Sequence, residues 1–256
     1  MLVMAVANQK GGVGKTTCCV NLSAELGRLG VRTLVVDADP QGNSSSALGV
    51  DRGSLCCSAY DVIAGEAAAR DAVTGTDWEN VFVLPATLDL AGAEVELAGA
   101  MSRESRLRRK MADLDGYDIA LIDCPPSLGL LTVNALVASD GILVPVQCEY
   151  FALEGLGQLL KTMDLVRSYL REDLSLSGLV MTMFDSRTRL SKEVVEEVRR
   201  QFGELVLDTV IPRNVKLSEA PSHGRPIAYY DPSSAGAEAF RELAREVQRK
   251  WLDPGR

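Results

Sequence analysis

Apolar residues along the chain alternate between short continuous runs and longer segments with helical spacing. The strand-like runs are LVMAVAN at 2–8, RTLVVD at 32–37, VFVLPA at 81–86, DIALID at 118–123, GILVPV at 141–146, SGLVMTMF at 177–184 and LVLDTVI at 205–211. Helical spacing is found near 16–29, 89–112, 151–171 and 190–202. Several runs are uninterrupted Val, Ile and Leu, which is typical of parallel strands covered on both faces. The pattern predicts an α/β fold with a doubly wound, mostly parallel central sheet flanked by helices.

The same pattern predicts one domain over residues 1–256. No linker, low-complexity tract or internal repeat interrupts the alternation of strands and helices. With 46% hydrophobic and 24% charged residues, the chain can bury a sizeable core and is not expected to be disordered.

The last segment, SAGAEAFRELAREVQRKWLD at 234–253, has the spacing of an amphipathic helix. Its apolar face consists of Phe240, Leu243, Ala244, Val247 and Trp251. A basic helix of this kind can bind a membrane surface, but here the polar face mixes glutamate with arginine. We therefore expect a helix packed on the domain and no membrane partner. Since no apolar run is long enough to span a bilayer and no secretory signal is evident, we expect a cytoplasmic protein with reduced cysteines.

The segment NQKGGVGKTT at 8–17 lies between the first strand and the first helix, where a phosphate-binding loop belongs. The common pattern G-x-x-x-x-G-K-[ST] requires a glycine where this chain has Gln9, and a second lysine, Lys10, follows it. The candidate nucleotide-binding residues are Lys10, Gly11, Gly12, Val13, Gly14, Lys15, Thr16 and Thr17. The glycines bring backbone N–H groups close to phosphate oxygens, Lys15 supplies positive charge, and the Thr16 hydroxyl is placed to bind Mg²⁺ directly. A glycine-rich turn without a ligand would not explain G-K-T-T at the start of a helix.

Three aspartates follow strand-like runs. Asp37 and Asp39 belong to VVDADPQGN, and Asp123 ends IALID before two prolines. The carboxyl ends of parallel strands face the ligand crevice, so these carboxylates can hold Mg²⁺ through water or orient an attacking water. A simpler alternative for Asp39 is a cap for the turn before Pro40.

Five motifs together resemble the ParA/Soj family of chromosome- and plasmid-partitioning ATPases, within the wider MinD-like group that carries this deviant phosphate loop. They are KGGVGKTT, DADPQGN, DCPPS, PVQCEYFALEGL and IPRNVKLSEAPSHGRPI. The resemblance implies an enzyme that uses ATP and Mg²⁺ and slowly hydrolyses ATP to ADP and phosphate. It also implies an ATP-bound sandwich homodimer that binds DNA non-specifically on the nucleoid. A ParB-like centromere-binding partner would stimulate hydrolysis and so release the dimer from DNA.

The resemblance also assigns roles to residues. Lys10 would reach the phosphates of the partner copy, and Gly11 would lie where the two copies approach most closely. Asp39 would position the hydrolytic water, with Asp37 and Asp123 near the metal, and Pro212 and Asn214 would lie near the adenine.

The charge distribution leaves room for DNA contacts in the last quarter of the chain. The net charge is −8, yet residues 187–256 hold 13 Lys+Arg against 11 Asp+Glu. The candidates are Arg189 and Lys216, ranked first, then Arg187, Lys192, Arg245, Arg249 and Lys250. Solvated charges on helix faces are the competing interpretation, especially for the last three. For the basic cluster at 103–110 we favour a charge that complements a helix C-terminus.

Two other functions remain open. A MinD-like or polar-localisation ATPase would use the same machinery to position another cargo. A metabolic phosphate-loop ligase, similar to dethiobiotin synthetase, would need a pocket for a second substrate, for which we find no motif.

Overall fold

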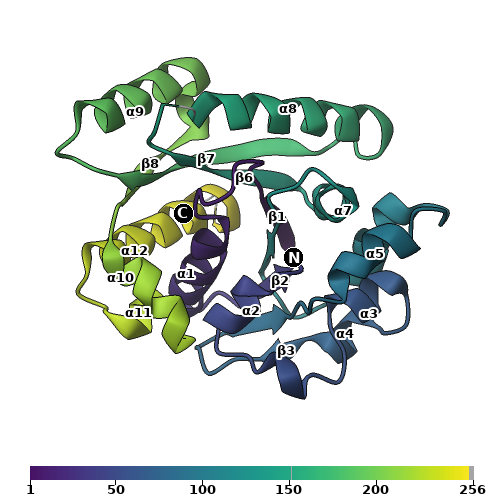
Figure 1. Cartoon of the computed structure of the whole chain (residues 1–256). Coiled ribbons are helices and arrows are strands. Elements are labelled where there is room, and N and C mark those ends of the chain that lie inside the picture. The colour runs from purple at the N-terminus through teal and green to yellow at the C-terminus, as the bar shows by residue number, and fades with distance from the viewer. Residues whose placement is uncertain (151, 254–256) are drawn as a thin grey trace.

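The computed structural model describes residues 1–150 and 152–253, and eight strands in them form one sheet (Figure 1). The strands are β1 (Leu2–Val6), β2 (Thr33–Asp37), β3 (Thr74–Gly75), β4 (Val81–Leu84), β5 (Ile119–Asp123), β6 (Gly141–Gln147), β7 (Ser175–Phe184) and β8 (Val206–Pro212). Their order across the sheet is β3-β4-β2-β5-β1-β6-β7-β8, and only the β3–β4 pair is antiparallel. The predicted fold class is confirmed.

Helices cover both faces of this sheet. The helices are α1 (Lys15–Arg28), α2 (Asn43–Ala47), α3 (Ala59–Ala64), α4 (Ala69–Ala72), α5 (Leu90–Glu96), α6 (Arg106–Met111), α7 (Leu130–Ala138), α8 (Ala152–Tyr169), α9 (Arg189–Phe202), α10 (Val215–Glu219), α11 (Ile227–Tyr230) and α12 (Ala235–Val247). Helices α1 and α12 lie together on one side of the sheet, while α5 and α7 lie on the other (Figure 1).

The sequence of β1 explains why two cores form. Val3 and Ala5 belong to the core beneath α5, α7 and α8, whereas Met4 and Val6 belong to the core beneath α1 and α12. Successive side chains of a strand point to opposite faces, so an uninterrupted apolar run supplies both layers at once. This central strand therefore holds the loop that follows it in a fixed position.

The predicted helix at 89–112 is wrong in one respect, because the segment is broken. It forms α5, a short 3-10 turn at Arg103–Ser105, and α6, with Ser102 in a left-handed conformation at φ 52°. Within the basic cluster at 103–110, Arg106 Nη1 donates to the Ala64 carbonyl at 2.8 Å and Lys110 Nζ to the Ala67 carbonyl at 2.8 Å. These cations thus satisfy carbonyls at and just beyond the end of α3, a helix other than the one whose C-terminus the sequence suggested.

Two other long helices agree with the sequence pattern. The helix expected at 151–171 is α8, although Phe151, where the prediction begins, lies outside the described residues. On α12, Phe240, Leu243, Ala244 and Val247 are buried against the domain, as expected. No helix in the described part of the chain has both the length and the apolar character needed to cross a bilayer.

Candidate functional site

The loop after β1 wraps around the N-terminus of α1. Gly12 and Gly14 adopt left-handed conformations, with φ 73° and 97°, and Gly14 is the N-cap of α1. A Cβ on either residue would be strained whatever the available space. Gly11 has no such requirement, and a Cβ built on it meets nothing within 4 Å in its own chain. The helix N-terminus and the glycine backbone together form a site suited to an anion.

Lys15 is buried beside this loop. Only 7% of the residue is exposed, and its Nζ donates to the Lys10 carbonyl at 3.4 Å. Burial lowers the pKa of Lys15, while the charges of Asp123 and Asp39 oppose that shift. A phosphate group in the loop would favour the charged amine in the same way.

Asp37 and Asp123 lie side by side because β2 and β5 are parallel and these two residues are register partners. Asp37 accepts hydrogen bonds from Ser45 N at 2.8 Å and Ser45 Oγ at 2.7 Å, and Asp123 accepts one from Ser44 Oγ at 2.7 Å. Burial and the charge of Asp123 raise the pKa of Asp37 to about 7. Burial likewise raises the pKa of Asp123 to about 6. Ionisation of the pair is therefore costly, and a cation beside it would offset that cost.

The residues around these carboxylates fit Mg²⁺ held partly by water. The Asp123 Oδ1 is buried without a hydrogen-bond partner, and the charge of Asp39 is close enough to affect the pKa of Asp123. Among the described residues, no group of three His, Cys, Asp or Glu side chains is arranged to hold an ion alone. Mg²⁺ commonly keeps several waters and takes its remaining ligands from one or two protein groups and from phosphates. Thr16 and Asp39 both line the pocket where such an ion and its phosphates would lie.

Two adjoining pockets extend from the loop. The first has a volume of about 360 Å³ and is lined by Gly11, Gly12, Gly14, Lys15, Thr16, Thr17, Asp39, Gln41, Asn43, Pro126 and Met183. The second, of about 260 Å³, is lined by Gly14, Thr17, Cys18, Thr182, Met183, Ile211, Pro212, Arg213, Asn214, Leu217, Ser218, Pro221 and Phe240. The first contains the Lys15 and Asp39 side chains, whereas the second adjoins Ile211, Leu217 and Phe240. Their combination suits a nucleotide with its phosphates in the first and its base in the second; Pro212 and Asn214 line the second.

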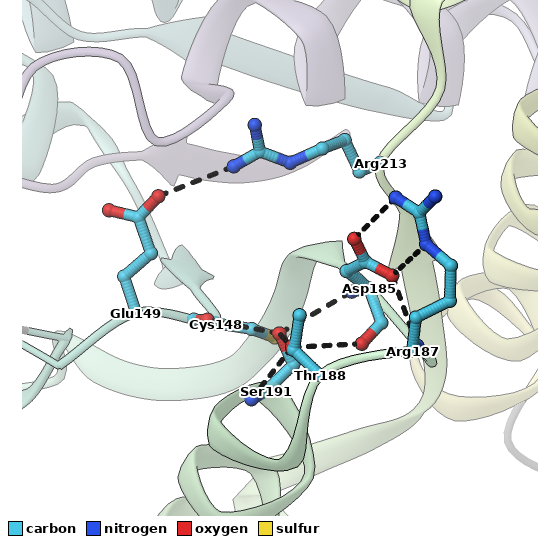
Figure 2. A network of polar contacts seen from close by, with 7 residues as sticks. All are labelled: Cys148, Glu149, Asp185, Arg187, Thr188, Ser191 and Arg213. Atoms are coloured by element: carbon cyan, nitrogen blue, oxygen red, sulfur yellow. Dashed lines mark hydrogen bonds and ion pairs between the residues drawn. The ribbon is translucent and has the colours of Figure 1, made fainter.

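Lys10 pairs with a carboxylate of its own chain. Its Nζ lies 3.6 Å from Glu149 Oε2, and the other oxygen of Glu149 lies 3.3 Å from Arg213 Nη2 (Figure 2 shows the Glu149–Arg213 contact). The side chains of Lys10 and Glu149 are 31% and 45% exposed, so water weakens the pair. Glu149 thus links the phosphate loop to the segment after β8 that lines the base pocket.

The basic residues considered for DNA contact lie just before and at the start of α9, on α10, and at the end of α12 with the following Gln248–Leu252. Four of them pair with nearby carboxylates at N–O distances of 2.6–2.8 Å: Arg187 with Asp185, Arg189 with Glu193, Lys216 with Glu219 and Arg245 with Glu242. Lys250 Nζ donates to the Glu204 carbonyl at 3.1 Å. The Arg187 guanidinium, which hydrogen-bonds to Asp185 in Figure 2, lowers the pKa of that carboxyl to about 2. The candidates therefore form no single continuous basic strip along one element.

Several residues at the site were not predicted from the sequence. Ser44 and Ser45 hold the two buried aspartates, Glu149 pairs with Lys10, and Met183 lines both pockets. The serines directly follow DADPQGN and were detectable as hydroxyls next to a carboxylate motif. Met183 gave no signal, because methionine inside an apolar run is typical of a core.

The chain matches known proteins over nearly its whole length. Residues 1–176 match the family model described as an AAA domain. The sporulation initiation inhibitor protein Soj of Bacillus subtilis is 54% identical over 246 residues, covering 96% of this chain and 97% of Soj. The chromosome partitioning protein ParA of Caulobacter vibrioides is 50% identical over 254 residues, covering 98% of this chain and 95% of ParA.

Solved structures agree with this relationship. A Mycobacterium smegmatis protein described as cobyrinic acid a,c-diamide synthase, with bound ADP and magnesium, is 42% identical with a TM-score of 0.86, covering 99% of this chain and 96% of the other. The same protein has been solved with an ATP analogue and magnesium. The Pyrococcus furiosus cell-division ATPase MinD is 32% identical with a TM-score of 0.79, covering 97% of this chain and 98% of MinD. Given its identity to Soj and ParA across almost its full length, together with the phosphate loop and aspartates described above, the chain belongs to the Soj/ParA family of chromosome-partitioning ATPases.

Proposed function

We propose that this chain is an ATP-hydrolysing switch for DNA partitioning, formed by a single domain over residues 1–256. The observation that carries the proposal is the two-lysine phosphate loop beside Asp37, Asp39 and Asp123, in a chain 54% identical to Soj. ATP and Mg²⁺ are the ligands that the site suits. The related structure with bound ADP and magnesium supports this choice.

Within the site, Gly12, Val13, Gly14 and Lys15 bind phosphates, Thr16 and Thr17 lie at the start of α1 beneath them, and Thr16 binds Mg²⁺. Asp39 orients the attacking water, while Asp37 and Asp123 hold waters of the metal shell. The second pocket, with Pro212 and Asn214, takes the adenine. Mg²⁺ supplies charge neutralisation at the phosphates.

Lys10 and Gly11 act between two copies of the chain. The exposed position of Gly11 and the loop position of Lys10 support a homodimer that forms face to face around ATP. Lys10 then stabilises phosphate charge in the partner copy, which couples hydrolysis to dimerisation as an arginine finger does. We assign nucleoid-bound DNA as the surface on which the dimer acts, and a ParB-like protein as the partner that stimulates slow hydrolysis.

The synthase described for the M. smegmatis relative gives a second candidate, in line with the metabolic alternative above. That relative is 42% identical, whereas Soj and ParA are 54% and 50% identical over comparable lengths. We therefore favour partitioning. A synthase would require its second substrate before it turned over ATP, and product analysis with ATP alone separates the two activities.

DNA binding with ATP, with ADP and without nucleotide, measured over a salt series, tests the proposal. Wild-type protein and Asp39→Ala are compared, since the variant should hold ATP without hydrolysing it. We expect binding only with ATP, retained in Asp39→Ala. On duplex DNA the log–log slope should be about −0.9 per phosphate contacted.

Three results would contradict the proposal. Binding that is absent in every nucleotide state would transfer the assignment to a MinD-like ATPase that positions another cargo. Binding that is independent of nucleotide would contradict control by ATP. Binding that is insensitive to salt would contradict contacts with DNA phosphates.

A further inference from the structure

Between Met181 and Phe184, β7 contains one residue more than the facing stretch of its partner strand. Met181 is paired with Val210 of β8, and Phe184 is paired with Pro212. Three steps along β7 therefore oppose two steps along β8, which is the count of a β-bulge. Within this bulge Met183 has φ 54°, in the left-handed region.

The bulge lies where β7 meets the two pockets. Thr182 Oγ1 donates to the Val13 carbonyl at 2.8 Å, so this side chain faces the phosphate loop. In a regular strand the next residue would face the opposite side of the sheet. Met183 instead lines both nucleotide pockets, together with Gly14 and Thr17. Bulges occur next to active sites for this reason, because they redirect a side chain.

This conformation is unfavourable for a residue with a side chain, and the surroundings hold it in place. The Thr182 hydroxyl donates to the Val13 carbonyl, and the Thr182 carbonyl accepts a hydrogen bond from Cys148 N at 3.0 Å. The residue before Met183 is therefore held by both its side chain and its backbone. Among the described residues, Asn80 and Ser102 are the other non-glycine positions with positive φ, and neither lines the two pockets. Backbone strain of this kind is concentrated at ligand sites, where the geometry is used.

We propose that Met183 is a nucleotide-contacting residue that packs against the ribose of bound ATP. Gly14, Thr17 and Met183 are the residues that the phosphate pocket and the base pocket share. In ATP the ribose is the group between base and phosphates, so it must pass this junction. Methionine offers a flexible apolar surface that adapts to such a group. This inference rests on the proposed ATP site and adds a residue to it.

The test compares the binding of Mg–ATP and of Mg–tripolyphosphate by calorimetry, since tripolyphosphate has neither ribose nor base. Met183→Ala should bind Mg–ATP roughly 3- to 10-fold more weakly, consistent with the loss of a few tens of Å² of apolar contact. Its affinity for Mg–tripolyphosphate should equal that of the wild type. Met183→Leu keeps an apolar side chain of similar size and should bind Mg–ATP nearly as well as the wild type.

Thermal unfolding without nucleotide separates strain from contact. Met183→Gly relieves the left-handed backbone and should unfold roughly 2–4 °C above Met183→Ala, although both bind Mg–ATP weakly. Ser102→Gly is the matched control, because Ser102 has φ 52° and lies outside both pockets. It should gain stability relative to Ser102→Ala without any change in nucleotide binding.

Unchanged Mg–ATP affinity in Met183→Ala would overturn the inference, and so would equal losses for Mg–ATP and Mg–tripolyphosphate, which would indicate a damaged phosphate loop. A wild-type protein that failed to bind Mg–ATP at all would instead overturn the proposed function.

Discussion

At the scale of single residues, the Lys10 side chain can pair with either of two anions. In its own chain it pairs with Glu149 at 3.6 Å, and in the proposed dimer it would contact the phosphates of the partner copy. One ammonium group cannot make both contacts at full strength. Glu149 therefore competes with dimer formation, and because each dimer requires two Lys10 side chains, the effect of this competition on the dimerisation constant is squared.

Opposite substitutions should shift dimerisation in opposite directions. Lys10→Ala should bind Mg–ATP but fail to dimerise or hydrolyse it, because the trans contact is lost. Glu149→Gln should dimerise with ATP at a concentration several-fold lower, since exposed pairs of this kind contribute about 0–1 kcal/mol each. Analytical ultracentrifugation of the two variants with ATP measures both effects. Glu197→Gln, which removes the exposed Arg200 pair on α9, is the control and should behave as the wild type.

A second prediction at this scale concerns the buried carboxylates. The folded pKa values of about 7 for Asp37 and about 6 for Asp123 lie above the usual value near 4. The folded state therefore binds protons more tightly than the unfolded state. The stability that this pair contributes is complete below about pH 4 and is lost as the pH rises through 6 and 7.

Asp123→Asn should reduce that loss, because it removes one carboxylate and its repulsion of Asp37. Without nucleotide, the unfolding free energy of the variant should fall between pH 5 and pH 8 by at least about 1 kcal/mol less than that of the wild type. This difference is the equivalent of about one pKa unit. Denaturant unfolding at the two pH values measures it. Parallel pH profiles for the two proteins would show that the carboxylates do not interact.

At the scale of elements, one residue on the polar face of α12 has a role that its sequence pattern does not indicate. Glu246 belongs to the helix face that looks polar, yet it is 6% exposed. Its carboxylate accepts hydrogen bonds from Asp208 N at 2.8 Å, Thr209 N at 3.0 Å and Thr209 Oγ1 at 2.7 Å. Glu246 thus joins α12 to β8, the strand that leads to the base pocket.

Glu246→Ala should therefore destabilise the fold, while Glu242→Ala should not. Removal of Glu246 leaves three donors of β8 without their acceptor, at a cost of about 3–5 kcal/mol. Glu242 lies one turn earlier and makes only the exposed pair with Arg245, so its loss should cost less than about 1 kcal/mol. Chemical denaturation of both variants decides between a structural and a merely solvated role for Glu246.

The sequence predicted those elements whose apolar pattern follows directly from burial. The seven apolar runs correspond to strands because a parallel sheet buries both faces of each strand. Helix α7 escaped prediction because LLTVNALVA is apolar nearly all round and has no stripe to detect. Strand β3 has two residues, too few for any period.

At the scale of the whole molecule, the sequence located one half of the site and missed the other. Asp37 and Asp123 were predicted at one edge because topology alone brings the ends of neighbouring parallel strands together. The β7 bulge depends on strand register, and the Lys10–Glu149 pair joins residues more than 100 positions apart in sequence; no local pattern encodes either. Resemblance supplied Pro212 and Asn214, and in the structure both line the second pocket.

The requirement for glycine at position 11 belongs to the assembly rather than to the chain. Gly11 needs no left-handed backbone, and a Cβ on it meets nothing within 4 Å, so a single copy of the fold tolerates a side chain there. Gly11→Val should therefore retain thermal stability and Mg–ATP binding, yet lose ATP-dependent dimerisation at least tenfold, because the branched side chain would separate the two loops. Gly75→Val is the matched control, since Gly75 is also open to solvent but lies on the edge strand β3. Light scattering with ATP, ADP and no nucleotide reports the dimer. If Gly11→Val dimerised normally, the two phosphate loops would not approach each other, and the face-to-face arrangement that gives Lys10 its role in trans would be excluded.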